Sequence, residues 1–238
     1  MPAMPRISRG FLRTDAESLA AGLLGQRLVR VLPGGERLSG IIVETEAYVG
    51  VIDRASHAFA GRRTARNESM YAQAGTAYVY FTYGMHWCFN IVCGRVDEPL
   101  AVLVRALEPV EGIERMRERR TRPGVDPPGD TALCSGPARL CQALAIDRSF
   151  NGIDLTRDAR LFLARANGVR PTESDVACSA RIGVGGAGEW ADAPLRFYLR
   201  ENPHVSRGGP VAGGRARAER ATVSAPARRP SGRGRAKR

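Results

Sequence analysis

The sequence predicts an α+β fold: a single domain with a curved, mostly antiparallel β-sheet flanked by helices. Three observations support this prediction. Strand-like runs dominate residues 27–109, two helical patterns come after them, and no repeat or linker interrupts the chain before about residue 206. Runs of strands followed by helices, without regular alternation, are typical of α+β proteins with antiparallel sheets.

A short helix and two strands are the first predicted elements. Thr14-Asp15-Ala16-Glu17 has the pattern of a capping box that opens a helix through SLAAGLL, and Gly25 is placed to end it. RLVRVL (27–32) and RLSGIIVETEAY (37–48) are predicted strands, joined by a turn at Pro33-Gly34-Gly35. Residues 49–75 are polar and irregular, and a loop of that length is usually functional or disordered.

Three strands and two helices are predicted after this loop. The strands cover residues 77–84, 87–93 and 101–109. One helix follows Pro109 in VEGIERMRERR, and the next lies in SGPARLCQALAI, with Ser135 as N-cap and Pro137 in its first turn. Residues 151–193 combine short pieces with a Gly-rich loop, and LRFYLR (195–200) is the last predicted strand.

The composition is that of a globular protein, with 43% hydrophobic and 25% charged residues. No run of 18 apolar residues is present, so we expect no membrane span. The start MPAMPRISRG lacks the apolar stretch of a secretory signal. The five cysteines are odd in number and never spaced CxxC, so we expect reduced thiols, several of them in the core, and no metal site.

The net charge of +12 is unevenly distributed. Residues 207–238 contain ten basic residues against one acid, Glu219, which is +9 and leaves +3 for residues 1–206. This segment is rich in Gly, Ala, Pro and Arg and has no apolar period, so we expect a disordered basic tail after a folded domain of residues 1–206. Such a tail can attract phosphate through counterion release, or it can be a solubilising extension. The sequence leaves both interpretations open.

The strand that ends in Glu44-Thr45-Glu46-Ala47-Tyr48 carries the most informative pattern. Glu44, Glu46 and Tyr48 alternate with Thr45 and Ala47, so they share one face of the strand. Two carboxylates and a phenol make a poor core face, but they suit a polar pocket in which a carboxylate acts as general base. The alternative interpretation is an exposed strand face with ordinary charges.

Tyrosines and cationic residues are interleaved in the same part of the chain. Five of the six tyrosines lie between residues 48 and 83, among several arginines and His57. Proteins that stack exposed bases and hold a nucleic-acid backbone use this combination. Core packing with satisfied hydroxyl groups explains the tyrosines equally well.

Six blocks of the sequence, in order, closely resemble the alkyladenine (3-methyladenine) DNA glycosylase family, from about residue 16 to about residue 200. They are IVETEAYVG, HAFAGRRTARN, GTAYVYFTYGMHWCFNIV, LVRALEP, LCSGPARLCQALAI and ARIGVGGAGEWADAPLRFYLR. The resemblance implies a monofunctional DNA glycosylase of base excision repair. Its implied substrates are alkylated or deaminated purines of the 3-methyladenine, hypoxanthine and ethenoadenine class.

The resemblance also implies a role for individual residues. Glu46 matches the general base that activates the attacking water, and Arg105 matches an arginine near the water site. Asn90 matches an asparagine that hinders the exocyclic amino group of guanine. The full set that matches the walls of the base pocket is Tyr48, His57, Tyr80, Asn90 and Leu103.

Other matched positions imply contacts with DNA. Tyr83, in the YGM turn with Met85, matches a wedge that fills the gap left in the duplex. Arg139 and the 181–188 loop, with Gly183 and Gly185, match positions that touch the DNA backbone. The implied partner is double-stranded DNA that contains a damaged purine, bound by a monomer, with no metal, no cofactor and no membrane. If the source is bacterial, the expected location is the cytoplasm, on the nucleoid.

Residues 183–188 also satisfy the dinucleotide-binding pattern GxGxxG. That pattern is specific only between a strand and a helix of a βαβ unit. No such strand or helix is predicted around these residues, so we expect no nucleotide cofactor here.

The distribution of lysine bears on the expected reaction. The only lysine of the chain is Lys237, in the basic tail, and Schiff-base enzymes normally use a lysine amine. Water is therefore the expected nucleophile, and we expect no strand-nicking lyase activity. Two other functions stay open: a non-catalytic protein that binds damaged DNA on the same fold, for which the Glu46 charge would be a liability, and an enzyme that acts on an RNA base.

Overall fold

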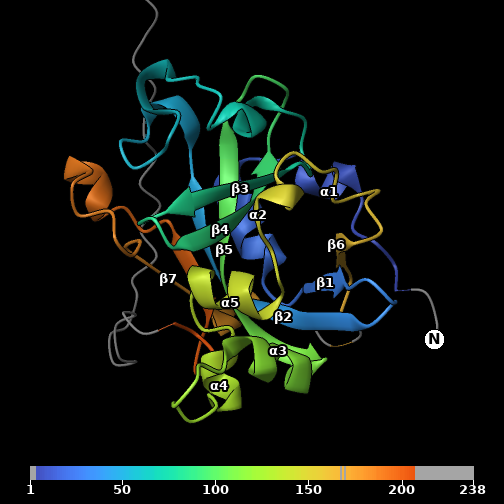
Figure 1. The fold of residues 1–238 in the computed structure, drawn as a ribbon. Coiled ribbons are helices and arrows are strands. Elements are labelled where there is room, and N and C mark those ends of the chain that lie inside the picture. Colours follow the sequence, from blue (N-terminus) through green and yellow to red (C-terminus); the bar gives the residue numbers. More distant parts are fainter. Residues whose placement is uncertain (1–3, 167, 169, 207–238) are drawn as a thin grey trace, which may run out of the picture.

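The computed structural model describes residues 4–166, 168 and 170–206 (Figure 1). It confirms the predicted α+β fold: within these residues, eight strands form one curled sheet in which every strand pair is antiparallel. The predicted disordered basic tail, residues 207–238, lies outside the described residues, and the boundary after residue 206 stays a prediction.

The main path of the sheet has the order β3-β4-β5-β2-β1-β6, and β8 pairs with β2 and with β7. The long strand β2 is the centre of this arrangement, because β1 pairs with its first half and β8 takes over beside Glu44–Glu46. The strands are β1 (Arg27–Val31), β2 (Arg37–Tyr48), β3 (Ala77–Thr82), β4 (His86–Cys93), β5 (Leu100–Glu111), β6 (Leu161–Ala164), β7 (Val176–Ser179) and β8 (Arg196–Leu199).

The helices form two groups on the sheet. In Figure 1, α1 and α2 (dark blue) lie together, and α3, α4 and α5 (yellow-green) form a separate cluster. Helix α2 packs on β2 and β5, whereas α5 packs on β4 and β5 and supports α3. Their bounds are α1 (Arg9–Leu12), α2 (Ala16–Leu23), α3 (Ile113–Arg120), α4 (Asp130–Leu133) and α5 (Pro137–Ala143).

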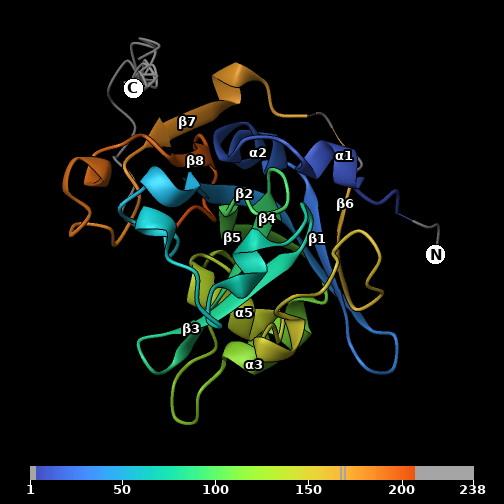
Figure 2. The same ribbon diagram turned by 90° about the horizontal axis from the view of Figure 1, so that it is seen from above.

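Six short 3₁₀ segments lie in the described connections. Three of them organise the loop that the sequence left irregular between β2 and β3. Figure 2 shows this loop (light blue) beside the orange segment that leads to β8. The segments are η1 (Gly50–Ile52), η2 (Phe59–Gly61), η3 (Glu68–Tyr71), η4 (Arg148–Phe150), η5 (Glu173–Asp175) and η6 (Gly188–Ala191).

Two predicted N-caps are wrong by one residue. Helix α2 is capped by Asp15 rather than Thr14, because the Asp15 carboxylate accepts from Ser18 N at 2.7 Å. Helix α5 begins after Gly136 rather than after Ser135, with Pro137 as its first residue as expected. Ser135 is unavailable as a cap because its backbone pairs with Ala106 of β5.

The predicted start of the third helix is also wrong. Strand β5 continues through Glu111, whose carboxylate accepts hydrogen bonds from Arg27 and Arg37 at the end of the sheet. The helix starts only at Ile113, after Gly112 with φ +75°. A Cβ at Gly112 would lie 2.7 Å from the Arg37 carbonyl oxygen, so this sharp change from strand to helix requires glycine.

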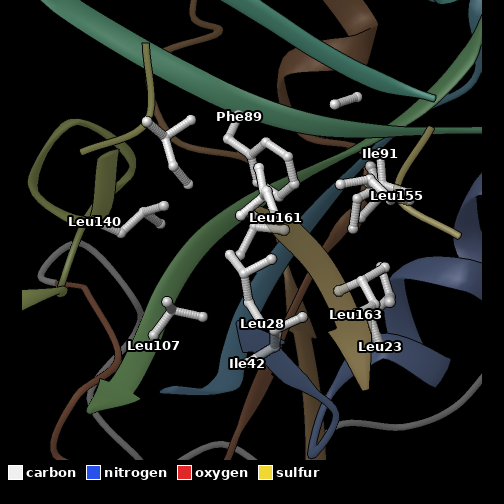
Figure 3. Close-up of a cluster of buried hydrophobic side chains, with 14 of the residues drawn as sticks. Leu23, Leu28, Ile42, Phe89, Ile91, Leu107, Leu140, Leu155, Leu161 and Leu163 are labelled. Atoms are coloured by element: carbon white, nitrogen blue, oxygen red, sulfur yellow. The ribbon is translucent and has the colours of Figure 1, made fainter. Parts of the chain in front are cut away.

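One face of the sheet builds the hydrophobic core. Figure 3 shows side chains from β1, β2, β4, β5 and β6 meeting those of α2 and α5. Residues of the central strands alternate, so that Phe89, Ile91, Val102 and Val104 point into this core. The residues between them face the opposite side of the sheet, where the functional site lies.

Four of the five cysteines are buried, only Cys178 is exposed, and all five are free thiols, as the sequence predicts. Among the helices of the described residues, none combines the length and the apolar character that a bilayer span requires.

Candidate active site

The second face of the sheet carries a row of polar and aromatic residues that runs across five strands. Tyr78 of β3 pairs with Asn90 of β4, Asn90 with Leu103 of β5, Leu103 with Glu46 of β2, and Glu46 with Arg196 of β8. Directly paired residues of antiparallel strands share a face, so the register itself assembles this row. All residues of this row except Arg196 line one cavity of about 360 Å³.

The cavity brings most of the predicted site residues together. Its lining includes the predicted Glu46, Tyr48, His57, Tyr80, Tyr83, Asn90, Leu103, Arg105 and Gly183. Of the five tyrosines between residues 48 and 83, all but Tyr71 line this cavity. The Tyr71 hydroxyl donates to the Arg62 carbonyl oxygen at 2.7 Å, outside the cavity.

Glu46 is fully buried at the wall of this cavity and accepts from three donors. Its Oε1 accepts from Ile182 N at 2.7 Å and is 3.1 Å from Arg105 Nη1, and its Oε2 accepts from Tyr48 Oη at 3.1 Å. An ionised carboxylate is an acceptor only, so these three donors match its charged form. The alternative interpretation of an exposed acidic strand face is wrong, because both Glu44 and Glu46 are inaccessible to solvent.

Glu44 forms a buried ion cluster behind Glu46. Its Oε1 accepts from Arg105 Nε at 2.9 Å, from Arg196 Nε at 2.7 Å and from Ser206 Oγ at 2.8 Å, and its Oε2 accepts from Ser206 N at 2.7 Å. Arg105 therefore bridges the two glutamates. Burial opposes the charge of Arg105, but Glu46 and Glu44 more than offset this effect and raise its pKa above the usual value.

Tyr48 lies between this cluster and a second buried ion pair. Arg181 makes a two-pronged contact with Asp53, at 2.6 and 2.8 Å, and its guanidinium carbon lies 4.7 Å from the centre of the Tyr48 ring. Burial, followed by the neighbouring Glu46 charge, raises the pKa of Tyr48 well above its ordinary value. Tyr48 therefore keeps its proton, and its hydroxyl donates a hydrogen bond to the Glu46 carboxylate.

His57, Tyr78 and Tyr80 form an aromatic group in the cavity wall. The His57 and Tyr80 rings meet edge to face with centroids 4.6 Å apart, and the two tyrosine rings are 5.3 Å apart. Asn90 is fixed in the floor beside them, because its Nδ2 donates to the Tyr78 carbonyl oxygen at 3.0 Å. Burial, with Arg66 and Arg62 nearby, lowers the pKa of His57.

The β3–β4 turn rises beside the cavity and exposes two large side chains. Tyr83 is 81% exposed, with φ +51°, and Met85 is 68% exposed. Met85 does not line the cavity, whereas Tyr83 does. Tyr83 is therefore an exposed aromatic side chain at a hairpin tip beside the cavity.

The Gly-rich 181–188 loop forms the opposite rim. Ile182, Gly183 and Val184 line the cavity, whereas Gly185 lies outside it, in open space. The GxGxxG match in this loop has no βαβ context in the described chain, since β7 before it and β8 after it form an antiparallel pair. This result agrees with the interpretation of the match as fortuitous.

Arg139 lies outside the cavity lined by Glu46, in a second cavity of about 400 Å³ that is rich in arginine and that we call the basic cavity. Its other lining residues include Arg120, Arg122, His86 and one carboxylate, Asp126. Burial, and then Arg139 and Arg122, lower the pKa of Arg120, whose Nε is buried without a partner. The two cavities are neighbours, because Pro137 lines the first and Ala138 the second.

The sequence did not single out several residues that build the site. Arg196, Ser206 and Asp53 complete the two ion clusters, and Asn67 holds the loop by donating from Nδ2 to the His57 carbonyl oxygen at 3.0 Å. Arg181 belongs to the 181–188 loop that the sequence matched to DNA contacts, but its side chain is buried against Asp53. Their partners are distant in sequence, so no local spacing reveals them. Within the described ranges, no three His, Cys, Asp or Glu side chains gather as a metal site would require.

Sequence comparisons with known proteins identify the family of this chain. A family model described as methylpurine-DNA glycosylase (MPG) matches residues 10–203. The DNA-3-methyladenine glycosylase of Homo sapiens is 49% identical over 207 residues, covering 85% of this chain and 68% of the human protein. The DNA-3-methyladenine glycosylase of Mus musculus is 46% identical, and the match covers 84% of this chain and 61% of the mouse protein. The chain therefore spans about three fifths of that relative. A protein of Natranaerobius thermophilus named putative 3-methyladenine DNA glycosylase is 42% identical, and the match covers 82% of this chain and 96% of that protein.

Proposed function

The chain belongs to the methylpurine-DNA glycosylase family, and from that premise we propose that it is a monofunctional DNA glycosylase that excises damaged purines. It acts as a monomer on double-stranded DNA, extrudes an alkylated or deaminated purine into the cavity lined by Glu46, which we call the base cavity, and hydrolyses the N-glycosidic bond. The observation that carries this proposal is the buried Glu46 carboxylate, which is held by three donors at the wall of that cavity.

In the proposed reaction, Glu46 accepts a proton from a water molecule in the cavity. The water oxygen forms a bond to C1′ of the sugar as the C1′–N bond breaks, and the base departs with the bonding electrons. The ionised carboxylate also stabilises the positive charge that develops on the sugar. Arg105 and Ile182 N hold Glu46 in place. A base that already carries positive charge leaves readily, whereas a neutral base such as hypoxanthine needs a proton on leaving.

The lining of the base cavity supports this proposal. Its aromatic wall offers stacking surfaces at Tyr48, His57 and Tyr80. We assign to the Asn90 amide, which is fixed in the cavity lining, the role of opposing the exocyclic amino group of guanine. Water is the proposed nucleophile, and the absence of lysine from residues 1–236 supports this choice, since Schiff-base enzymes normally use a lysine amine.

The test of this function is excision from a labelled duplex with a single hypoxanthine or ethenoadenine, or from methylated DNA. We expect release of the base, strand breakage only after alkali, and no borohydride-dependent crosslink to abasic DNA. Tight binding without release from any of these substrates would favour the damage-binding function instead. Competition by single-stranded RNA as effective as that by lesion DNA would favour an enzyme of RNA bases.

Replacing Tyr83 with Ala is expected to weaken binding to lesion and abasic duplexes roughly tenfold to a hundredfold, because aromatic stacking on a base is worth about 1–3 kcal/mol. The fluorescence of a 2-aminopurine next to the lesion reports the loss of base extrusion. Val96→Ala is a matched control, because Val96 is also an exposed apolar residue but lines neither the base cavity nor the basic cavity. Equal affinities of the Tyr83 variant and wild type would remove Tyr83 from the wedge role.

The basic cavity is proposed to hold backbone phosphate beside the extruded base. Arg122→Gln combined with Arg139→Gln is expected to weaken binding to lesion and undamaged duplexes alike. It should also reduce the slope of log K against log salt by about 2, because each phosphate that a cation neutralises accounts for about 0.9 of that slope. Arg157→Gln, at an exposed arginine outside both cavities, provides the control. An unchanged slope would place the phosphate-binding residues elsewhere.

A further inference from the structure

Residues 202–206, which we call the strap, connect the end of the described chain to strand β5. At one end of the strap, Asn202 Nδ2 donates to Glu108 Oε2 at 2.9 Å. At the other end, Ser206 reaches Arg105, one turn of the pleat further back along β5. The strap therefore holds the strand that carries Arg105 at two points.

Ser206 is buried and bonds Glu44 with both its backbone and its side chain. Its N–H donates to Glu44 Oε2 at 2.7 Å, and its hydroxyl donates to Glu44 Oε1 at 2.8 Å. The same hydroxyl oxygen accepts from Arg105 Nη2 at 3.4 Å. A serine hydroxyl can donate and accept at once, so Ser206 joins the carboxylate to the guanidinium.

Arg105 carries the effect of these contacts to Glu46. Its Nε donates to Glu44 Oε1 at 2.9 Å and its Nη2 to Ser206 Oγ, and its Nη1 lies 3.1 Å from Glu46 Oε1. A guanidinium is a planar, rigid fork, so fixing two of its nitrogens determines where the third one lies. The place of the positive charge beside Glu46 therefore depends on the Ser206 hydroxyl.

We propose that Ser206 is a positioning residue, whose hydroxyl fixes the Arg105 guanidinium and thereby the orientation of the Glu46 carboxylate during excision. This inference rests on the proposed function and adds to it a residue that does not line the base cavity. Without the hydroxyl, Glu44 Oε1 loses a donor and Arg105 Nη2 loses an acceptor. The guanidinium is then drawn toward Glu44 and away from Glu46.

Ser206→Ala in the full chain removes the hydroxyl and keeps the backbone donor to Glu44. We expect the single-turnover rate of base excision to fall about tenfold, which corresponds to about 1.4 kcal/mol of barrier. The affinity for the lesion duplex should stay within about twofold of wild type, because Ser206 lies outside the base cavity. An unchanged rate, or a loss of affinity as large as the loss of rate, would overturn the proposal.

Ser39→Ala is the matched control for a general loss of stability. Ser39 is also buried, its hydroxyl likewise accepts from an arginine, Arg27, and donates to a glutamate, Glu111, and it lies outside both cavities. Urea denaturation measures the stability of both variants, and excision is compared at a temperature at which both are folded. We expect Ser39→Ala to excise as fast as wild type. An equal slowing in the two variants would contradict the proposal.

A double-mutant cycle with Glu46→Gln tests the route of the effect. If Ser206 acts through the general base, Ser206→Ala should cost about tenfold in the wild-type background and less than about twofold in the Glu46→Gln background. The same factor in both backgrounds would overturn the proposal. A wild-type chain that excises no base contradicts the proposed function, whereas an active wild type with an equally active Ser206→Ala variant contradicts only the role of Ser206.

Asn202→Ala tests the strap at its other end, away from the buried charges. It removes the bond to Glu108 and the acceptor that Asn202 Oδ1 offers to His204 N at 2.9 Å. We expect a smaller loss of excision rate, roughly threefold, and again less than about twofold in the Glu46→Gln background. If Ser206→Ala does not fold, an Asn202→Ala variant as fast as wild type overturns the proposal on its own.

Discussion

Glu46→Gln is expected to reduce the single-turnover rate of base excision by about 10²–10⁴-fold, the usual contribution of a general base. An amide cannot take a proton from water, nor can it stabilise a cationic sugar as a carboxylate does. The affinity for lesion DNA should stay close to that of wild type. Rapid-quench measurement of base release at saturating enzyme isolates the chemical step, and a separate binding titration on the same duplex gives the affinity.

The surroundings of Glu46 allow this substitution without loss of the fold. The amide oxygen can replace Oε1 opposite Ile182 N and Arg105, and the amide nitrogen can donate to Tyr48 Oη, which is able to accept. Arg105 also keeps its ion pair with Glu44. Glu36→Gln, at a half-exposed carboxylate paired with Arg115 outside the cavity, is the matched control. A rate within a few-fold of wild type would refute the role of Glu46 as general base.

The fold and the walls of the pocket were largely predictable from the sequence, because both follow from the alternation of residues along strands. Period-two patterns located β2, β3, β4 and β5, and the same alternation placed Glu44, Glu46 and Tyr48 on one face. Once antiparallel register aligns these strands, the residues of that face meet. The resemblance in sequence then identified which of them face the cavity.

The unpredicted part of the site consists of long-range contacts between buried charges. Arg181 meets Asp53 across 128 residues, and Arg196 meets Glu44 across 152 residues. Sequence patterns report whether an arginine is charged, but not whether it is buried or what it faces. The misplaced helix starts have a similar cause. Ser135 pairs with Ala106, and Glu111 binds Arg37, and these tertiary contacts outweigh the local sequence preference for a helix start.

These buried charges must satisfy one another, so we expect the fold to be sensitive to substitutions in the cluster around Glu44. Arg196 is completely buried, and Arg105 is nearly so. Glu44 neutralises both and also accepts from Ser206 at the end of the described chain. Removal of one partner from a buried ion pair leaves an uncompensated charge in a medium of low polarity, and this costs far more than the pair itself contributes.

Glu44→Gln is therefore expected to lower the free energy of unfolding by about 3–5 kcal/mol. Both oxygens of Glu44 face donors, so an amide nitrogen in either position would meet another N–H group. Urea denaturation measures the change, and thermal unfolding should show a drop of roughly 6–20 °C.

The exposed ion pair between Glu68 and Arg63 offers the matched control, since Glu68→Gln should cause no measurable change in stability. If Glu44→Gln were as stable as wild type, the cluster would not be holding Arg105 and Arg196 in the fold. A stable variant with slow excision would assign Glu44 to the orientation of Arg105 alone. The expected loss of stability would instead show that the fold itself depends on the Glu44 carboxylate.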